Sequence, residues 1–323
     1  MNWKGNNKGT KVSRAKSLCL ASRLSSTRMP TTRSAHWKAA FFCALAFLAG
    51  CNSKNGKPRA DHPRLTSGVT SRDLQFHSSA LNRDMPYRVI LPAHLQSNQK
   101  LQTVYLLHGS GGDFREWSND SDVAQFAEDG LLLVMPEGES SYYTNSASRQ
   151  QDRFEDYIVS DLVADVESRF PVATGRANHA AIGISMGGFG AIKIALRHPE
   201  IYAFVGGMSS AIDVPRRSFS VRRIDQWRHY NEIFGPKGSP SRRDNDPFVL
   251  IRTADPGPAP YFFLTCGDKE GLLPSNREFA AVVEQRHFRY EFHILHGGHD
   301  WNQWNPELAE VFRSLILHLG TVQ

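Results

Sequence analysis

One segment of the chain has the pattern of a nucleophilic serine in a tight turn. It is Gly183-Ile184-Ser185-Met186-Gly187, with an apolar run of strand length before it (residues 180–184) and a helical pattern after it (residues 190–197). The small residues on either side let the backbone turn sharply enough to expose a serine at the end of a strand. Five-residue patterns also arise by chance, but the strand–turn–helix context favours Ser185 as a nucleophile.

A serine hydroxyl is a weak nucleophile unless a base lies beside it. His299 suits this role because it follows the predicted strand 290–295 in a glycine-containing loop, His296-Gly297-Gly298-His299-Asp300-Trp301. The spacing of His293, His296 and His299 by three residues raises zinc binding as an alternative. Alternation along a strand would scatter these side chains, and no second ligand cluster accompanies them. We therefore predict that His299 is the base, that His296 is not, and that no metal or other cofactor is used.

An acid must hold the histidine in the correct tautomer and stabilise its charged form. In the strand–turn–helix arrangement of such serines, the order along the chain is serine, acid, histidine. The loop Cys266-Gly267-Asp268-Lys269-Glu270 follows the apolar run 261–265 and offers two carboxylates. Either Asp268 or Glu270 could serve.

Two backbone N–H groups should stabilise the negatively charged oxygen that forms when a serine attacks an ester carbonyl. One is expected from Met186, the residue after the nucleophile. The other is expected from Ser110 in the glycine-rich loop His108-Gly109-Ser110-Gly111-Gly112, which follows the apolar run 103–107.

These loops must be positioned by alternating strands and helices. We predict an opening antiparallel pair of strands, then buried strands, with helices between them. The predicted strands are residues 74–80, 87–91, 103–107, 131–135, 180–184, 204–208, 261–265 and 290–295, and the predicted helices are 154–170, 190–197 and 307–319. Such alternation indicates an α/β fold with a mostly parallel sheet covered on both faces. Residues 213–258 interrupt the alternation, and we interpret them as an insertion over the site.

The net charge of +6 comes from the beginning of the chain. The first 50 residues hold nine of the 38 basic residues and none of the 32 acidic ones, so the rest has three more acidic than basic residues. The folded part therefore lacks the basic excess that nucleic-acid binding requires.

The basic leader resembles an export signal. An apolar run over residues 39–48, too short to span a membrane, follows Arg33 and Lys38 and ends in Leu48-Ala49-Gly50-Cys51. These four residues resemble a bacterial lipobox, which implies lipidation of Cys51 and a membrane anchor; an ordinary cleaved signal is the alternative. Met29 would begin a leader of normal length. We expect residues 1–50 to be leader, 51–72 a flexible tether, and 73–323 the folded domain, in which Cys266 is a buried apolar residue.

With these motifs placed, the chain resembles the esterase D family of α/β-hydrolases over residues 73–320. This family includes feruloyl and acetyl-xylan esterases, S-formylglutathione hydrolases and mycolyltransferases. The resemblance is carried by Tyr105-Leu106-Leu107-His108-Gly109, Gly183-Ile184-Ser185-Met186-Gly187-Gly188, Cys266-Gly267, and Gly297-Gly298-His299-Asp300-Trp301 with Trp304. It implies an α/β-hydrolase fold and the roles given above. The family's acid stands six residues before an asparagine, here Asn276, which points to Glu270, although many members have aspartate there.

Within this family the feruloyl-esterase type is the most similar. S-formylglutathione hydrolases usually carry histidine where this chain has Ile184 and Phe189, and mycolyltransferases lack the doubled glycine at 187–188. We therefore predict an exported, membrane-anchored serine hydrolase of carbohydrate-linked or aryl esters. An aryl or sugar group could contact an aromatic set made of Trp117, Tyr142, Tyr143 and Trp301. Alternatives are an acyltransferase with the same triad and a catalytically silent binding protein on the same scaffold.

Overall fold

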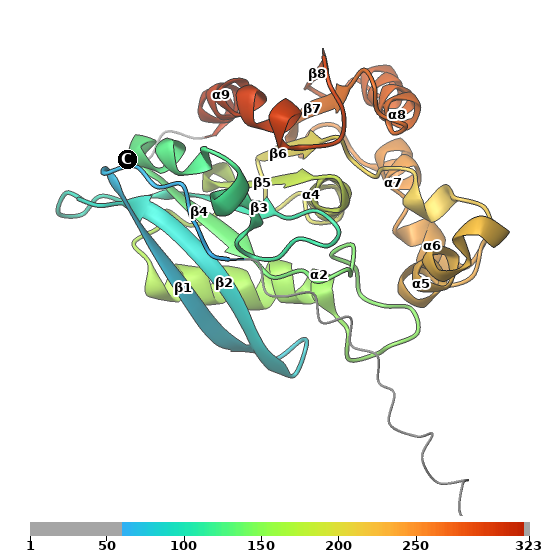
Figure 1. Cartoon of the computed structure of the whole chain (residues 1–323), viewed down its shortest axis with the longest axis horizontal. Coiled ribbons are helices and arrows are strands. Elements are labelled where there is room, and N and C mark those ends of the chain that lie inside the picture. Colours follow the sequence, from blue (N-terminus) through green and yellow to red (C-terminus); the bar gives the residue numbers. More distant parts are fainter. Residues whose placement is uncertain (1–59, 320–323) are drawn as a thin grey trace, which may run out of the picture. The chain divides into compact units, whose positions relative to one another are not determined.

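A computed structural model describes residues 60–319 of the chain, so the predicted leader and Cys51 lie outside the described residues. Its centre is an eight-stranded sheet in the order β1-β2-β4-β3-β5-β6-β7-β8 (Figure 1). The strands are β1 (Val69–Ser78), β2 (Arg83–Pro92), β3 (Gln102–Leu107), β4 (Leu131–Pro136), β5 (His179–Ile184), β6 (Phe204–Met208), β7 (Tyr261–Gly267) and β8 (Tyr290–Leu295). The pairs β1–β2 and β2–β4 are antiparallel and all others are parallel. The predicted mostly parallel sheet is confirmed.

Helices cover both faces of the sheet. The α-helices are α1 (Glu116–Asp120), α2 (Phe154–Asp156), α3 (Val163–Arg169), α4 (Met186–Arg197), α5 (Ile224–Phe234), α6 (Pro240–Asp244), α7 (Pro247–Thr253), α8 (Leu273–Gln285) and α9 (Trp301–His318). Short 3-10 helices are η1 (Val123–Asp129), η3 (Arg176–Asn178), η4 (Val214–Arg216) and η5 (Val221–Arg223), and η2 (Tyr157–Leu162) is a π-helix.

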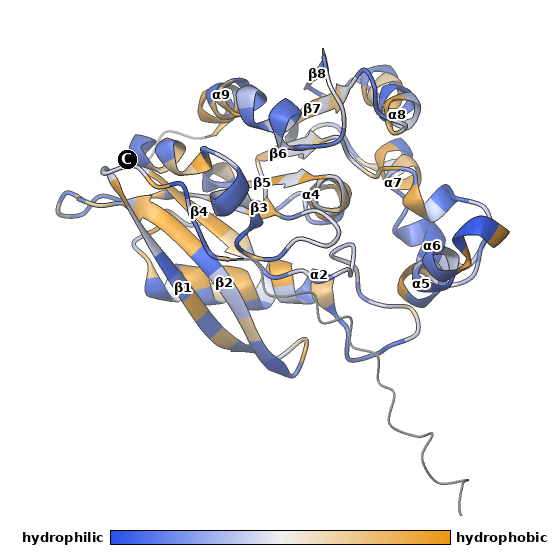
Figure 2. Cartoon of the chain, in the orientation of Figure 1, coloured by the Kyte–Doolittle hydropathy of each residue, from blue (hydrophilic) through white to orange (hydrophobic). Residues whose placement is uncertain are grey.

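The hydrophobic core has two parts, one on each face of the sheet. One part joins the sheet to η2, α3, α4 and α8, and the other joins it to α1, η1 and α9. The central strands are buried almost throughout, and their residues are mostly hydrophobic (Figure 2). A strand covered on both faces needs such a continuous apolar run, and this is why β3, β4 and β5 could be predicted from sequence.

Three predicted boundaries are corrected by the structure. The folded part begins before residue 73: β1 begins at Val69, and Asp61 pairs with the buried Arg88 (2.7 Å), so the end of the predicted tether is packed on the sheet. The predicted helix 154–170 consists of α2, η2 and α3, with a π-helical turn in its middle. The last helix begins at Trp301 instead of 307, because the Asp300 side chain caps it by accepting from the Asn302 N–H, and Pro306 lies inside the helix.

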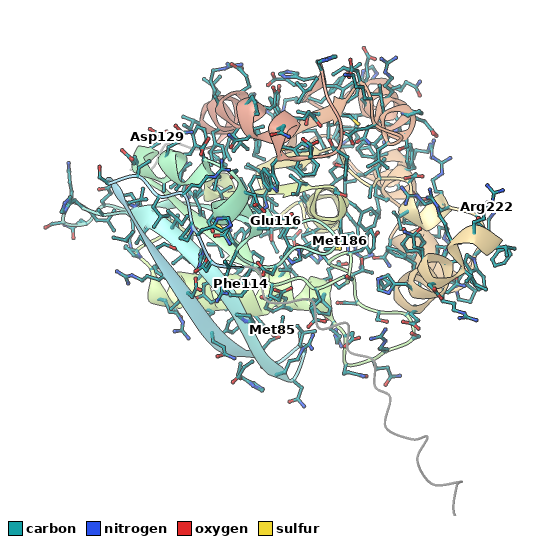
Figure 3. The ribbon with its side chains drawn as sticks, in the orientation of Figure 1. Met85, Phe114, Glu116, Asp129, Met186 and Arg222 are labelled. Carbon is teal, nitrogen blue, oxygen red and sulfur yellow. The ribbon has the colours of Figure 1, made fainter. Side chains whose placement is uncertain are left out.

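The segment 213–258 lies between β6 and β7 and contains η4, η5, α5, α6 and α7. Its outer end, marked by Arg222, lies far from Met186 at the start of α4 (Figure 3). Its inner side reaches the main body, where Tyr230 packs edge-on against Tyr142 at 5.7 Å between ring centroids. Within residues 60–319, no helix has both the length and the apolar character needed to span a membrane.

Candidate active site

Ser185 lies at the sharp turn between β5 and α4. Its backbone angles, φ 52° and ψ −110°, lie in a region that non-glycine residues rarely adopt. Backbone hydrogen bonds to the end of β6 and the loop after it hold this conformation: the Ser185 N–H donates to Met208 O (2.9 Å), and the Ser185 carbonyl accepts from the Ala211 N–H (2.9 Å). The turn therefore has the strained geometry of a nucleophile elbow.

The structure brings Ser185, His299 and Glu270 into one hydrogen-bonded chain. His299 Nε2 lies 2.9 Å from Ser185 Oγ, and His299 Nδ1 lies 2.6 Å from Glu270 Oε2. Because the carboxylate can only accept, the Nδ1 proton points to Glu270, and Nε2 is free to accept the serine proton. The side chain of His299 is 39% exposed, whereas that of Glu270 is 1% exposed. The base can therefore reach a substrate, and the acid is shielded from water.

The second carboxylate oxygen of Glu270 is fixed by three groups from separate parts of the fold. Oε1 accepts from Ser209 Oγ (2.5 Å) after β6 and from the Gly267 N–H (2.9 Å) at the end of β7. Gln303 on α9 also donates to Oε1 (2.8 Å) when its amide nitrogen faces that oxygen. Ser209 in turn accepts from Trp304 Nε1 (2.8 Å). These bonds satisfy the buried charge and leave Glu270 one orientation toward His299.

Asp268 belongs to a different pair. Its carboxylate bonds the exposed His296 Nδ1 (3.0 Å) and the Gly297 N–H (3.0 Å). These two hydrogen bonds hold the pKa of Asp268 below its usual value. Neither Asp268 nor His296 joins the chain that contains Ser185.

The three histidines spaced by three do not converge. The ring of His293 lies between Glu307 on α9 (2.7 Å from Nδ1) and Glu291 on β8 (3.2 Å from Nε2). His296 and His299 have the partners described above. Within the described part of the chain, no group of three or more histidine, cysteine or acidic residues could hold a metal ion.

The two expected N–H donors lie on elements that pack directly together. Met186 is the first residue of α4, so its N–H has no acceptor within the helix. The next residue, Gly187, lies against the end of β3: a Cβ there would overlap the carbonyl oxygens of Leu107 and His108. Ser110 follows two residues after His108, and the start of α4 and the Ser110 loop are thus neighbours.

Glu116 on α1 fixes the Ser110 loop through a hydrogen bond. Its Oε2 accepts from the Gly109 N–H (2.8 Å), so the donor next to Ser110 is already occupied. Burial raises the pKa of Glu116. Figure 3 shows Glu116 and Met186 in the central part of the molecule.

Most of the aromatic set does not line an open site. Trp117 and Tyr143 are buried in the two parts of the core, Tyr142 is also buried, and only Trp301 is half-buried. A different set lines a cavity of about 540 Å³ beside the loop after Glu270, consisting of Asp213, Arg217, Ser218, Ser220, Arg223, Gln226, Trp227, Tyr230, Gly271 and Leu272.

Sequence reasoning missed the residues that hold Glu270, namely Ser209 and Gln303. Ser209 could have been identified from the sequence, because it is a polar residue that directly follows β6 at the edge of the sheet where Ser185 lies. No sequence pattern identifies Gln303, because its contact with Glu270 depends on where helix α9 begins.

In sequence and fold, the chain is similar to known esterases. The Esterase family model matches residues 78–315. An acetyl esterase from Caldicellulosiruptor saccharolyticus is 23% identical over 254 residues, covering 74% of this chain and 95% of that protein. The diacylglycerol acyltransferase/mycolyltransferase Ag85A of Mycobacterium leprae is 24% identical over 288 residues, covering 78% of this chain and 84% of that protein. The solved structure of a ferulic acid esterase superposes with a TM-score of 0.66 at 22% identity, covering 78% of this chain and 99% of the other.

Proposed function

The chain belongs to the Esterase family, and we propose that it hydrolyses carboxylic esters through an acyl-enzyme formed on Ser185. The observation that carries this proposal is the hydrogen-bonded chain from Ser185 Oγ through His299 to Glu270. A weak nucleophile, a base in contact with it and a buried acid that orients the base are the parts that acyl transfer to serine requires.

In the proposed mechanism, His299 Nε2 takes the proton of Ser185 as Oγ attacks the ester carbonyl carbon. The N–H groups of Ser110 and Met186 donate to the resulting oxyanion, and Glu270 stabilises the charged imidazole. His299 then gives its proton to the departing alcohol. In the second half of the reaction, His299 takes a proton from water as the water oxygen attacks the acyl carbonyl carbon. His299 then returns a proton to Ser185 Oγ, which releases the carboxylic acid and restores Ser185.

The test is hydrolysis of p-nitrophenyl esters of graded chain length by the full-length protein. We expect measurable turnover, and we expect Ser185→Ala to lower it by about 10⁶-fold because triad serines typically contribute that much. Circular dichroism would establish that the variant is folded. Substantial turnover by folded Ser185→Ala protein would refute the proposal.

For the substrate, we favour carbohydrate-linked or aryl esters. The cavity beside the loop after Glu270 combines the aromatic rings of Trp227 and Tyr230 with hydrogen-bonding side chains, which suits a sugar or a substituted aryl group. The acetyl esterase and ferulic acid esterase relatives are consistent with this choice. Feruloylated and acetylated sugars, compared with simple alkyl esters, would test it through kcat/KM.

Acyl transfer to an alcohol is a second candidate, favoured by the similarity to the Ag85A acyltransferase. The two activities share the acyl-enzyme and differ in whether water or an alcohol accepts the acyl group. Product analysis in the presence of sugar or glycerol acceptors would distinguish them. We also propose that the protein is exported and anchored through a lipid on Cys51, for which the sequence Leu48-Ala49-Gly50-Cys51 is the support.

A further inference from the structure

Tyr143 lies between the two elements that carry the expected oxyanion donors. It is completely buried, and its ring packs on α4, where a Cβ on Gly190 would lie 2.5 Å from ring atom Cδ2. On the other side, the ring is packed edge-on against His108, with 5.8 Å between centroids. One side chain thus contacts both the helix that begins with Met186 and the loop that leads to Ser110.

The Tyr143 hydroxyl holds that loop directly. It donates to His108 O at 3.1 Å, the carbonyl of the peptide unit that leads into Gly109 and Ser110. The His108 ring fixes the same stretch, because its Nδ1 lies 2.8 Å from Gly109 O and its Nε2 accepts from the Gly138 N–H at 2.8 Å. The position of the Ser110 loop therefore depends on where Tyr143 is held.

The backbone around Tyr143 would not adopt its conformation unaided. Tyr142 and Tyr143 have positive φ angles of 55° and 51°. Bulky residues rarely adopt such angles, and two in succession persist only where the surroundings fix them.

A buried lysine on α4 provides that fixation. Lys193 is completely buried, and its ammonium group donates to Tyr143 O (2.6 Å), Thr144 Oγ1 (3.1 Å) and Glu155 Oε2 (2.6 Å). All three of its N–H bonds are thus used, as a buried cation requires. Arg197 and His198 bond the other oxygen of Glu155 at 2.7 and 2.9 Å.

We propose that Tyr143 is a positioning residue that sets the separation between the Ser110 and Met186 N–H donors, and that Lys193 holds Tyr143 in place. This inference rests on the proposed ester hydrolysis and adds a device by which the fold prepares the oxyanion site. In this proposal, the buried ammonium group of Lys193 contributes to catalysis only by holding Tyr143 in position, and it does not contact the substrate.

Tyr143→Phe tests the proposal because it keeps the ring and removes only the bond to His108 O. The control is Tyr202→Phe: Tyr202 is also completely buried, it lies at the opposite end of the sheet just before β6, and its hydroxyl makes no hydrogen bond among the described residues. In the full-length protein, we expect Tyr143→Phe to lower kcat by about tenfold with little change in KM, since removing a whole oxyanion donor costs 10²–10³-fold. Affinity for a trifluoromethyl ketone, which forms a tetrahedral oxyanion on serine, should fall by the same factor.

If Tyr143 has a purely structural role, Tyr143→Phe should lower the melting temperature but leave kcat and ketone affinity unchanged at temperatures where the variant is folded. That result would overturn the inference. It would leave the proposed function intact if the wild type hydrolyses esters and Ser185→Ala does not. A wild type without any esterase activity would overturn both.

A second variant tests the role of the lysine. Replacing the pair together, Lys193→Met with Glu155→Leu, avoids leaving either fully buried charge without its partner. Arg197 and His198, which also bond Glu155, are partly exposed and can be solvated. We expect the same loss in kcat and in ketone affinity as for Tyr143→Phe. Unchanged values in the folded double variant would refute the part assigned to Lys193.

Discussion

At the scale of single residues, two carboxylates two positions apart have separate environments. Glu270 points into the core toward His299, whereas Asp268 lies at the surface and bonds His296. Sequence reasoning from motif position left both open, because both follow β7. The resemblance, through the spacing to Asn276, singled out Glu270, and Asn276 is itself buried and donates to Ser210 O (2.8 Å) beside the site.

Glu270→Gln should therefore lower turnover by about 10⁴-fold, the effect of such an exchange in another serine hydrolase, because an amide can favour the wrong tautomer of the histidine. Asp268→Asn is the matched control and should retain most of the activity. Turnover on one simple ester would be compared, with circular dichroism as the folding check. Loss of activity in Asp268→Asn alone would transfer the role to Asp268.

Cys266 illustrates a residue whose burial determines its chemistry. It is completely buried on β7, and burial together with the nearby charge of Glu270 raises its pKa to about 12. The thiol therefore stays protonated at pH 8, and only the thiolate reacts readily. We expect iodoacetamide at pH 8 to leave esterase activity intact and to label Cys266 only after denaturation. Rapid labelling of the native protein with loss of activity would contradict this.

At the scale of elements, the site depends on how closely α4 approaches β3. Strands β3, β5 and β7 were predictable because each is a nearly continuous apolar run, and reactive residues follow their carboxyl ends. The groups that lock the loops were not predictable. Tyr143 and Gln303 act through contacts between distant segments, and no local pattern encodes such contacts.

Gly187→Ala tests this close approach. The added methyl group would overlap Leu107 O and His108 O, so α4 must move away from β3. We expect a stability loss of about 1–3 kcal/mol, as for other overpacked sites. Displacement of the elbow should also lower turnover by about 100-fold. Thermal unfolding and kcat would be measured beside Gly257→Ala, where the added atom meets Asp255 at an ordinary 3.4 Å. Equal behaviour of the two variants would refute the argument.

At the scale of the whole molecule, charge is distributed unevenly along the chain: residues 1–50 hold nine basic and no acidic residues, and the rest has three more acidic than basic residues. Sequence reasoning put the start of the folded part too late, because ion pairs such as Asp61 with Arg88 join a polar segment to the sheet and leave no periodic signal. The predicted leader lies outside the described residues and stays a prediction.

Lipidation of Cys51 can be tested in the full-length protein. We expect the mature protein to fractionate with membranes and mass spectrometry to find no peptide N-terminal to Cys51. Cys51→Ser should abolish lipid attachment and release the protein from the membrane fraction. A soluble wild-type product that begins at another residue would indicate an ordinary cleaved signal.

The most direct measurement of the central claim is covalent labelling with a fluorophosphonate, followed by peptide mass spectrometry. We predict a single adduct on Ser185, formed much more slowly in His299→Ala because the serine then lacks its base. An adduct on another residue, or ester hydrolysis that continues in fully labelled protein, would contradict the assignment of Ser185 as the nucleophile.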